Sequence, residues 1–280
     1  MTVPAMVKPL SWGVKLPRFL RISPSFGLVA LAVIVLLAVA GPMVSGDPNR
    51  ISPAQRLQFF SAEHLLGTDG LGRDLFARIA NGASVSMLVG LYVGLAATVI
   101  GVAIGLVAGY FKRVDSVIMR VMDGMMAIPP LLLAVALASI GEASFGMVVF
   151  ALTIPEIPRI VRVARSEVLT LRTRLYIDAA VVSGSSAFKI MYRHIVPNLV
   201  APLSIQITYV CAHAILAEAG LSFIGAGLPP DNPSWGVIVS ENRSYFQSAP
   251  WTIFVPGFFL TITILAVSSL GDRLREKFGG

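Results

Sequence analysis

Three carboxylates lie within or next to long apolar stretches of this sequence. They are Asp123, Glu156 and Glu218. If such a stretch crosses a membrane, an ionised carboxylate at its centre costs at least about 2.5–3.5 kcal/mol, so the side chain must face other helices or water. Asp123 follows Arg120 by three residues, and Glu156 precedes Arg159 by three. Because residues three apart are neighbours on a helix, both spacings predict local ion pairs.

Glu218 lies near the end of its apolar stretch, five residues after His213. It either lines a path for a polar solute or holds the loop that follows it through backbone amides. The residues leave both interpretations open. Glu218, Glu156 and His213 are therefore the candidates for side chains along a translocation path.

Catalytic and cofactor motifs are absent from the sequence. It contains no G-x-x-x-x-G-K-[ST] motif, so it lacks the usual loop that cradles nucleotide phosphates. His64, His194 and His213 belong to different segments, and Cys211 is the only cysteine. This spacing predicts no metal site, and a single cysteine excludes an intrachain disulfide. We expect no catalytic residue and no cofactor in this chain.

The composition is that of a membrane protein with several helices. Of the 280 residues, 55% are hydrophobic and 13% are charged, whereas soluble domains have about 25% charged residues. This excludes a disordered chain, a nucleic-acid-binding arm and an ordinary soluble enzyme. Six apolar stretches approach the ~20 residues needed to cross a bilayer: Phe26–Ser45, Ala83–Tyr110, Val117–Gly141, Phe145–Val163, Val200–Leu221 and Trp251–Leu270.

The basic residues indicate the orientation in the bilayer. With the N-terminus inside, 17 of the 22 Lys and Arg residues lie in cytoplasmic segments. The positive-inside rule therefore places both termini in the cytoplasm, and the net charge of +7 needs no nucleic acid to explain it. A cleaved signal peptide in residues 1–45 is the alternative for the N-terminal region. Its apolar run is too long, because such peptides have a core of about 7–15 residues.

Glycines and prolines punctuate the apolar stretches. The second stretch has small residues at four-residue spacing, which lets another helix backbone approach closely, in this chain or in another subunit: Gly90, Gly94, Gly101, Gly105 and Gly109. The third and fourth stretches contain Pro129, Pro130, Pro155 and Pro158. Interior prolines kink a helix, and membrane proteins tolerate such kinks beside neighbours or cavities. This favours a transporter over a simple anchor.

Two short helices joined at Gly184 are predicted between Leu171 and Asn198. Apolar residues recur at helical spacing in the first (Tyr176, Ile177, Ala180, Val181) and in the second (Phe188, Met191, Tyr192, Ile195). Gly184 fits a left-handed C-cap and Ser185 or Ser186 an N-cap, while Pro197 fits the end of the second helix. This cytoplasmic elbow either lies on anionic lipid or docks into a groove of a soluble partner.

A glycine-rich external segment precedes the second stretch. Its candidate residues are Gly67, Thr68, Asp69, Gly72, Arg73 and Asp74. Asp69 and Asp74 are expected to pair with Arg73 and Arg78, and a short amphipathic helix with Leu75 and Ile79 follows. We expect the segment to cap the helix bundle. Direct contact with substrate or its delivery protein is the alternative.

The elbow carries the order Asp178-Ala179-Ala180, three residues, Gly184 and Ile195-Val196-Pro197. This pattern resembles the EAA loop of bacterial ABC import permeases, Glu-Ala-Ala, three residues, Gly, nine residues and Ile-x-Leu-Pro. Asp replaces Glu here, His194 takes the first Ile position and Val196 replaces Leu. The resemblance implies that the elbow docks on an ATPase subunit through a set of coupling residues: Asp178, Ala179, Ala180, Gly184, Phe188, Met191, Ile195 and Pro197.

Further segments resemble the C-type subunits of dipeptide, oligopeptide and nickel permeases. They are His64–Asp74, Glu218–Gly225, Pro229-Pro230, Ser234–Gly236, Pro256-Gly257 and Gly271–Arg275. The sequence departs from that pattern at Ser84, where the family often has Arg, and at Ser268-Ser269, where Asn is usual. The resemblance runs from about Phe26 to the C-terminus.

This resemblance implies an all-α membrane protein with six transmembrane helices and the type I importer permease fold. It divides the chain into a cytoplasmic segment (1–25), a first helix with the external segment (26–82), a permease domain (83–271) with the coupling loop (171–198), and a cytoplasmic tail (272–280). The expected location is the bacterial inner membrane.

The resemblance also implies the partners and the mechanism. They are a homologous B-type permease, two ATPase subunits that bind ATP and Mg²⁺, and an external solute-binding protein, with transport by alternating access. Peptides are the expected cargo, and nickel chelates, opines and glutathione are alternatives. A secondary transporter or channel without ATP is the remote alternative, but the sequence shows no inverted repeat of broken helices.

Overall fold

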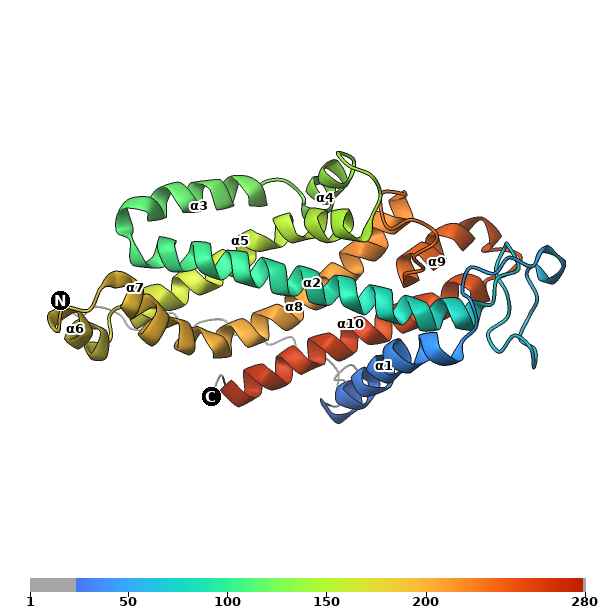
Figure 1. Ribbon diagram of the computed structural model, residues 1–280, viewed down its shortest axis with the longest axis horizontal. Helices are drawn as coiled ribbons and strands as arrows, with labels where there is room; N and C mark the ends of the chain where they lie inside the picture. Colours follow the sequence, from blue (N-terminus) through green and yellow to red (C-terminus); the bar gives the residue numbers. More distant parts are fainter. Residues whose placement is uncertain (1–23, 279–280) are drawn as a thin grey trace, which may run out of the picture.

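A 36-residue helix, α2 (Leu75–Tyr110), runs along the bundle and contacts most of the other long helices (Figure 1). The computed structural model describes residues 24–278, and within this range all regular secondary structure is helical. The remaining long helices are α1 (Pro24–Val44), α3 (Lys112–Met126), α5 (Phe145–Leu171), α8 (Val196–Ile224) and α10 (Trp251–Phe278). The short ones are η2 (Pro53–Gln55), α4 (Pro130–Ala138), α6 (Leu175–Val182), α7 (Ala187–Ile190), the π-helix η3 (Met191–Ile195), α9 (Trp235–Asn242) and η4 (Arg243–Tyr245).

The all-helical membrane fold predicted from the sequence is confirmed, but six spans are not. In the described residues four helices are long and apolar enough to cross a membrane, and five if the bent pair α3 and α4 forms one span. The sixth candidate, α5, has 27 residues but carries Glu156, Arg159 and Arg162 within its first 18. The predicted N-terminal segment 1–25 lies outside the described residues except for its last two.

Proline has different consequences in the two predicted kinked stretches. The third stretch breaks before Pro129-Pro130, and α3 and α4 meet there at 86°. Pro155 and Pro158 instead lie inside a single helix, α5. In both cases the proline ring removes a backbone donor, but the helix is interrupted only in the third stretch.

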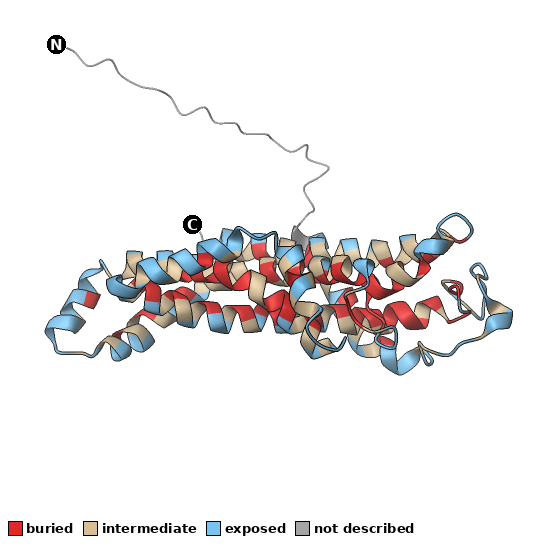
Figure 2. Cartoon of the chain, turned by 90° about the horizontal axis from the view of Figure 1, so that it is seen from above, coloured by how far each residue is buried: buried red, intermediate tan, exposed pale blue. Residues whose placement is uncertain are grey.

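The glycine ridge of α2 packs within this chain. A Cβ at Gly90 would lie 2.7 Å from Ile215 of α8, and a Cβ at Gly101 would lie 2.6 Å from Ile160 of α5. Gly105 approaches α5 in the same way. Figure 2 shows the resulting seam of buried residues along the interior of the bundle. Of the two interpretations left open by the sequence, the contacts favour packing against α5 and α8 rather than a subunit interface.

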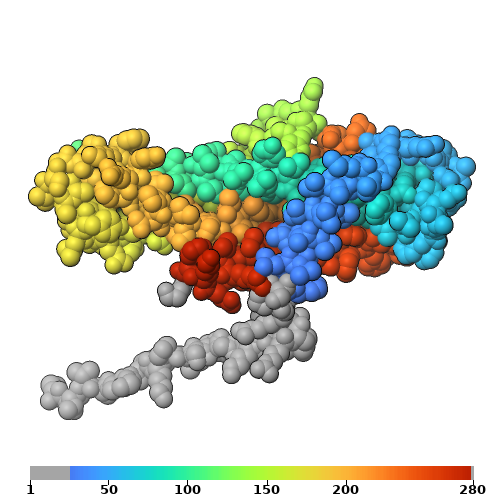
Figure 3. Space-filling model, turned by 60° about the horizontal axis from the view of Figure 1, so that its bottom comes forward, coloured from blue at the N-terminus to red at the C-terminus, as the bar shows by residue number. Residues whose placement is uncertain are grey.

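The first long helix packs against α2, and the last, α10, packs against α1 and α8. Ile34 of α1 belongs to a buried cluster with Leu75 and Trp235, against which Trp251 and Phe259 of α10 pack. Figure 3 shows α1 crossing α10 at an angle, with the external segment at one end of the molecule and the elbow at the other. The two predicted functional regions therefore lie at opposite ends of the helix bundle.

Candidate functional site

Asp69 organises the external segment. Its fully buried side chain accepts hydrogen bonds at Oδ1 from the backbone N–H groups of Leu71 (2.8 Å) and Arg73 (2.9 Å). At Oδ2 it accepts a hydrogen bond of 2.6 Å from Arg73 Nε, and Arg78 Nε lies 3.8 Å away. Of the two predicted acids, Asp69 contacts both arginines, and the prediction that Asp74 pairs with them is wrong.

The turn around Thr68 is held by backbone and hydroxyl contacts. The backbone N–H of Gln58 donates to Thr68 Oγ1 at 2.8 Å, and the same hydroxyl donates to the carbonyl of Gln55. Gly67 has φ +77° and Gly72 has φ +74°, a region that disfavours side chains. A Cβ at Gly67 would lie 2.6 Å from the Gln58 carbonyl oxygen, so the close approach of two chain segments also requires glycine.

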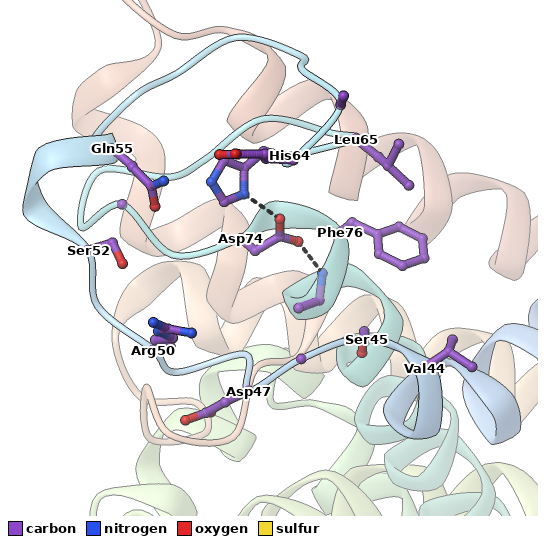
Figure 4. Close-up of a pocket in the computed structure, with 15 residues that line it drawn as sticks. Val44, Ser45, Asp47, Arg50, Ser52, Gln55, His64, Leu65, Asp74 and Phe76 are labelled. Atoms are coloured by element: carbon purple, nitrogen blue, oxygen red, sulfur yellow. Dashed lines mark hydrogen bonds and ion pairs between the residues drawn. The ribbon is translucent and has the colours of Figure 1, made fainter.

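Asp74 begins α2 and fixes a histidine. Its Oδ1 accepts a hydrogen bond from the backbone N–H of Ala77 (2.8 Å), the usual N-cap contact. Its Oδ2 lies 2.7 Å from His64 Nδ1 (Figure 4). These residues line an external cavity of about 550 Å³ together with Asp47 and Arg50. The helix that starts here continues to Tyr110, so the short separate helix predicted around Leu75 and Ile79 is wrong.

Two arginines connect the external segment to α9. Arg73 Nη2 donates to Glu241 Oε2 at 3.0 Å, and Arg78 Nη2 donates to the same oxygen at 2.5 Å. Arg78 is fully buried and also reaches Asn49 Oδ1 at 3.4 Å. Glu241 is not predictable from the sequence, because it lies 163 residues from Arg78 and has no local motif.

In the elbow, the short helix α6 ends before Gly184, and α7 begins after it and continues into α8. Gly184 has φ +74°, as a left-handed C-cap requires. The Ser186 hydroxyl accepts a hydrogen bond from the Lys189 backbone N–H at 3.4 Å. The predicted end at Pro197 is wrong, because α7, η3 and α8 form one helix over Ala187–Ile224. In η3 the Val196 N–H bonds to Met191 O, five residues back, and this wider turn accommodates the proline ring.

The predicted apolar stripe of the second elbow helix is divided between two faces. Ile190 and Ile195 are buried in a cluster with Ile177 and Val168, and Met191 packs against it. Phe188 and Tyr192 are 75% and 71% exposed, and their rings stack with centroids 6.5 Å apart. The remaining residues predicted to couple are Asp178, Ala179, Ala180 and Pro197, of which only Ala180 also packs partly against the cluster.

Glu156 and His213 come together in the middle of the bundle. His213 Nδ1 lies 2.6 Å from Glu156 Oε1 without hydrogen-bond alignment, and Arg159 Nη1 lies 3.3 Å from Glu156 Oε2. The local ion pair predicted for Glu156 is therefore present. His213 and Glu156 line a cavity of about 400 Å³ between α4, α5 and α8. This pairing across helices was not predicted.

Glu218 lies outside that cavity. It is fully buried, and its Oε1 accepts hydrogen bonds from the hydroxyls of Ser222 and Ser234, each 2.7 Å long. The Ser234 hydroxyl also caps α9 by accepting from the Val237 N–H at 3.0 Å. Glu218 thus ties α8 to the start of α9 through hydroxyl groups, not through the backbone amides considered from the sequence.

The acids of α3 pair with arginines of α5. Arg162 Nη2 lies 2.7 Å from Asp123 Oδ1, and Arg165 Nε lies 2.5 Å from Asp115 Oδ1. The predicted pair of Asp123 with Arg120 on its own helix is wrong. After the turn at Phe111, α3 packs back against α5, so the acids meet cations on the other helix.

Comparison with known proteins identifies the family. A family model described as "binding-protein-dependent transport system inner membrane component" matches residues 97–279. A probable peptide ABC transporter permease of Sinorhizobium fredii is 48% identical over 243 residues, covering 87% of this chain and 84% of the relative. The chain belongs to this family.

Other similarities agree with this assignment. The dipeptide transport system permease DppC of Alkalihalophilus pseudofirmus is 39% identical, covering 89% of this chain and 83% of the relative. An inward-facing structure of the MetNI methionine ABC transporter aligns with a TM-score of 0.61 at 17% identity, covering 72% of this chain and 96% of the matched one. The importer permease fold inferred from the EAA-like elbow is confirmed. The protein is a multi-pass ABC importer permease, a transport subunit whose ATP hydrolysis resides on separate subunits.

Proposed function

We propose that this permease moves di- or oligopeptides. Relatives at 48% and 39% identity are named as peptide and dipeptide permeases, and this similarity is the observation that supports the cargo assignment. A glutathione transport system permease of Pectobacterium atrosepticum is 35% identical over 92% of this chain, which keeps glutathione as a second candidate. Nickel chelates and opines are the further alternatives from the sequence.

The elbow is the proposed contact with an ATPase subunit. Phe188 and Tyr192 present an exposed, stacked aromatic surface, while Ile195 and Ile190 anchor the same helix in the bundle. Because this helix continues directly into α8, a force on the aromatic pair is transmitted to the helix that holds His213 and Glu218. We assign Asp178, Ala179, Ala180, Gly184 and the residues up to Pro197 to this coupling unit.

The proposed assembly contains a second, homologous permease, two ATPase subunits and an external binding protein. ATP and Mg²⁺ belong to the ATPase subunits. ATP binding there moves the elbows and opens the path outward, the binding protein releases its cargo, and hydrolysis restores the inward-facing arrangement. Such a cycle needs only two packings of the helices whose balance the nucleotide shifts.

We place the elbow and both termini in the cytoplasm. In Figure 1, α1 runs toward the external segment and α10 runs back from it toward the elbow end. This arrangement supports the orientation derived from the distribution of Lys and Arg. The residues Gly67–Asp74 then lie outside, where they cap α2 and face the binding protein.

Reconstitution tests the proposed function. The chain would be purified with its co-purifying subunits and binding protein, placed in liposomes, and supplied with ATP and a radiolabelled dipeptide. We expect ATP-dependent dipeptide accumulation and recovery of two ATPases and a second permease. Uptake of glutathione but not of the dipeptide would change the cargo assignment, and uptake by the chain alone without ATP would contradict the importer mechanism.

A further inference from the structure

A group of charged side chains lies near the middle of α5, at Glu156 and Arg159. At 1.5 Å per residue, Arg159 is about 20 Å from either end of this helix. The guanidinium does not face lipid, because charged groups on membrane helices face the bundle interior, water or another subunit. On this face the Arg159 guanidinium lies beside a cavity that Glu156 and His213 line.

The arrangement places the Glu156 carboxylate behind a guanidinium and an imidazole. The Glu156 side chain is only 5% exposed, whereas Arg159 and His213 are 42% and 38% exposed. Glu156 lies within 3.3 Å of Arg159 Nη1 and 2.6 Å of His213 Nδ1, so it orients both. A solute that approaches this face therefore meets the guanidinium and the imidazole before the carboxylate. This arrangement suits an anionic group better than an ammonium group.

The cavity next to these groups is apolar. Besides Glu156 and His213, its lining includes one leucine from each of three helices: Leu131 of α4, Leu152 of α5 and Leu216 of α8. Its volume of about 400 Å³ lies within the range of small-ligand sites. The ligand that fits is a carboxylate with an adjacent apolar side chain.

We propose that this site binds the C-terminal carboxylate of the transported peptide. Arg159 and His213 donate hydrogen bonds to the carboxylate oxygens, and the last side chain of the peptide enters the apolar cavity. Guanidinium groups suit this role because their donors match both carboxylate oxygens. Glu156 is a positioning residue that holds the two donors. The proposal rests on the proposed peptide cargo and adds the part of the peptide that the permease recognises.

A cysteine-protection experiment tests the site without the binding protein. Leu216→Cys would be introduced with Cys211→Ala into the purified complex of the permeases and ATPases, and the rate of maleimide labelling measured. The probes are N-acetyl-leucine, which has a carboxylate, and N-acetyl-leucinamide, which lacks it. We expect millimolar N-acetyl-leucine to slow labelling and the amide to have little effect. In Arg159→Gln the acid should need a roughly 10-fold or higher concentration, as for a lost hydrogen bond to a charged group.

Arg162→Gln is the matched control, because it removes the same charge one helical turn further along α5, where the partner is Asp123. Protection by the acid should survive in this variant. Equal protection by acid and amide, or loss of protection in both arginine variants, would overturn the carboxylate site. Peptide uptake by the reconstituted importer is measured separately, so a failed site with normal uptake leaves the proposed function intact, and absent peptide uptake refutes that function itself.

Discussion

Arg78 and Glu241 connect α2 to α9: Arg78 Nη2 at the start of α2 lies 2.5 Å from Glu241 Oε2 in α9. Arg73 Nη2 reaches the same oxygen at 3.0 Å. The Asp69 carboxylate contacts Arg73 Nε at 2.6 Å and lies 3.8 Å from Arg78 Nε. The external segment, α2 and α9 are therefore connected by one charged network. Its most buried cation is Arg78, which has no exposed surface.

Replacing Arg78 by leucine should destabilise the protein by about 1.5–3 kcal/mol, because it removes a charged donor to Glu241 and leaves Arg73 as the cation that Asp69 and Glu241 share. Thermal unfolding in detergent, followed by tryptophan fluorescence, measures the effect. Arg50→Leu removes the same charge from an exposed position and should change the melting temperature little. Equal melting temperatures for the two variants would contradict the structural role of Arg78.

The contact between α2 and α5 requires glycine at position 101. An added Cβ there would lie 2.6 Å from Ile160 Cβ, so Gly101→Ala should cost about 1–3 kcal/mol through overpacking. Gly257→Ala in α10 is the matched control, since no heavy atom lies within 4 Å of the added Cβ. Alanine favours a helix by about 0.8–1.0 kcal/mol, so this control should be neutral or stabilised. A melting temperature for Gly101→Ala at or above that of the control would show that the helices do not pack as described.

Gly184→Trp should uncouple transport while leaving membrane insertion intact. The position has φ +74°, a conformation that costs residues with a side chain about 1–2 kcal/mol, and the bulky ring would disturb the docking surface. We expect uptake to fall by roughly an order of magnitude. Gly184→Asn tests the cause, because asparagine tolerates this conformation and should retain most uptake. Normal uptake by Gly184→Trp with the ATPases still bound would refute the coupling role.

Glu218→Gln should affect uptake less than Gly184→Trp, because glutamine keeps an acceptor for the Ser222 and Ser234 hydroxyls. Glu218→Leu removes this acceptor, which should cost about 1–3 kcal/mol for each hydroxyl left without a partner. Uptake and melting temperature are measured for both variants. A large loss of uptake in Glu218→Gln at unchanged melting temperature would place Glu218 in the transport path.

The sequence by itself determined the membrane class, the family and the turn at Gly184. These features depend on composition and on residues close together in the chain. A long apolar run predicts a membrane helix whatever its neighbours are, and the left-handed cap at Gly184 depends only on the local backbone conformation. The end predicted at Pro197 was wrong because a π-turn accommodates the proline inside a continuous helix.

Only the tertiary structure decided which distant groups meet. Asp123 pairs with Arg162 rather than with Arg120, His213 meets Glu156 rather than Glu218, and Glu218 holds Ser234. Spacing along one helix identifies neighbours on that helix, but a partner on another helix depends on how the two helices are rotated and offset. Contacts such as that between Gly101 and Ile160 set this rotation, because packed side chains leave few alternative arrangements.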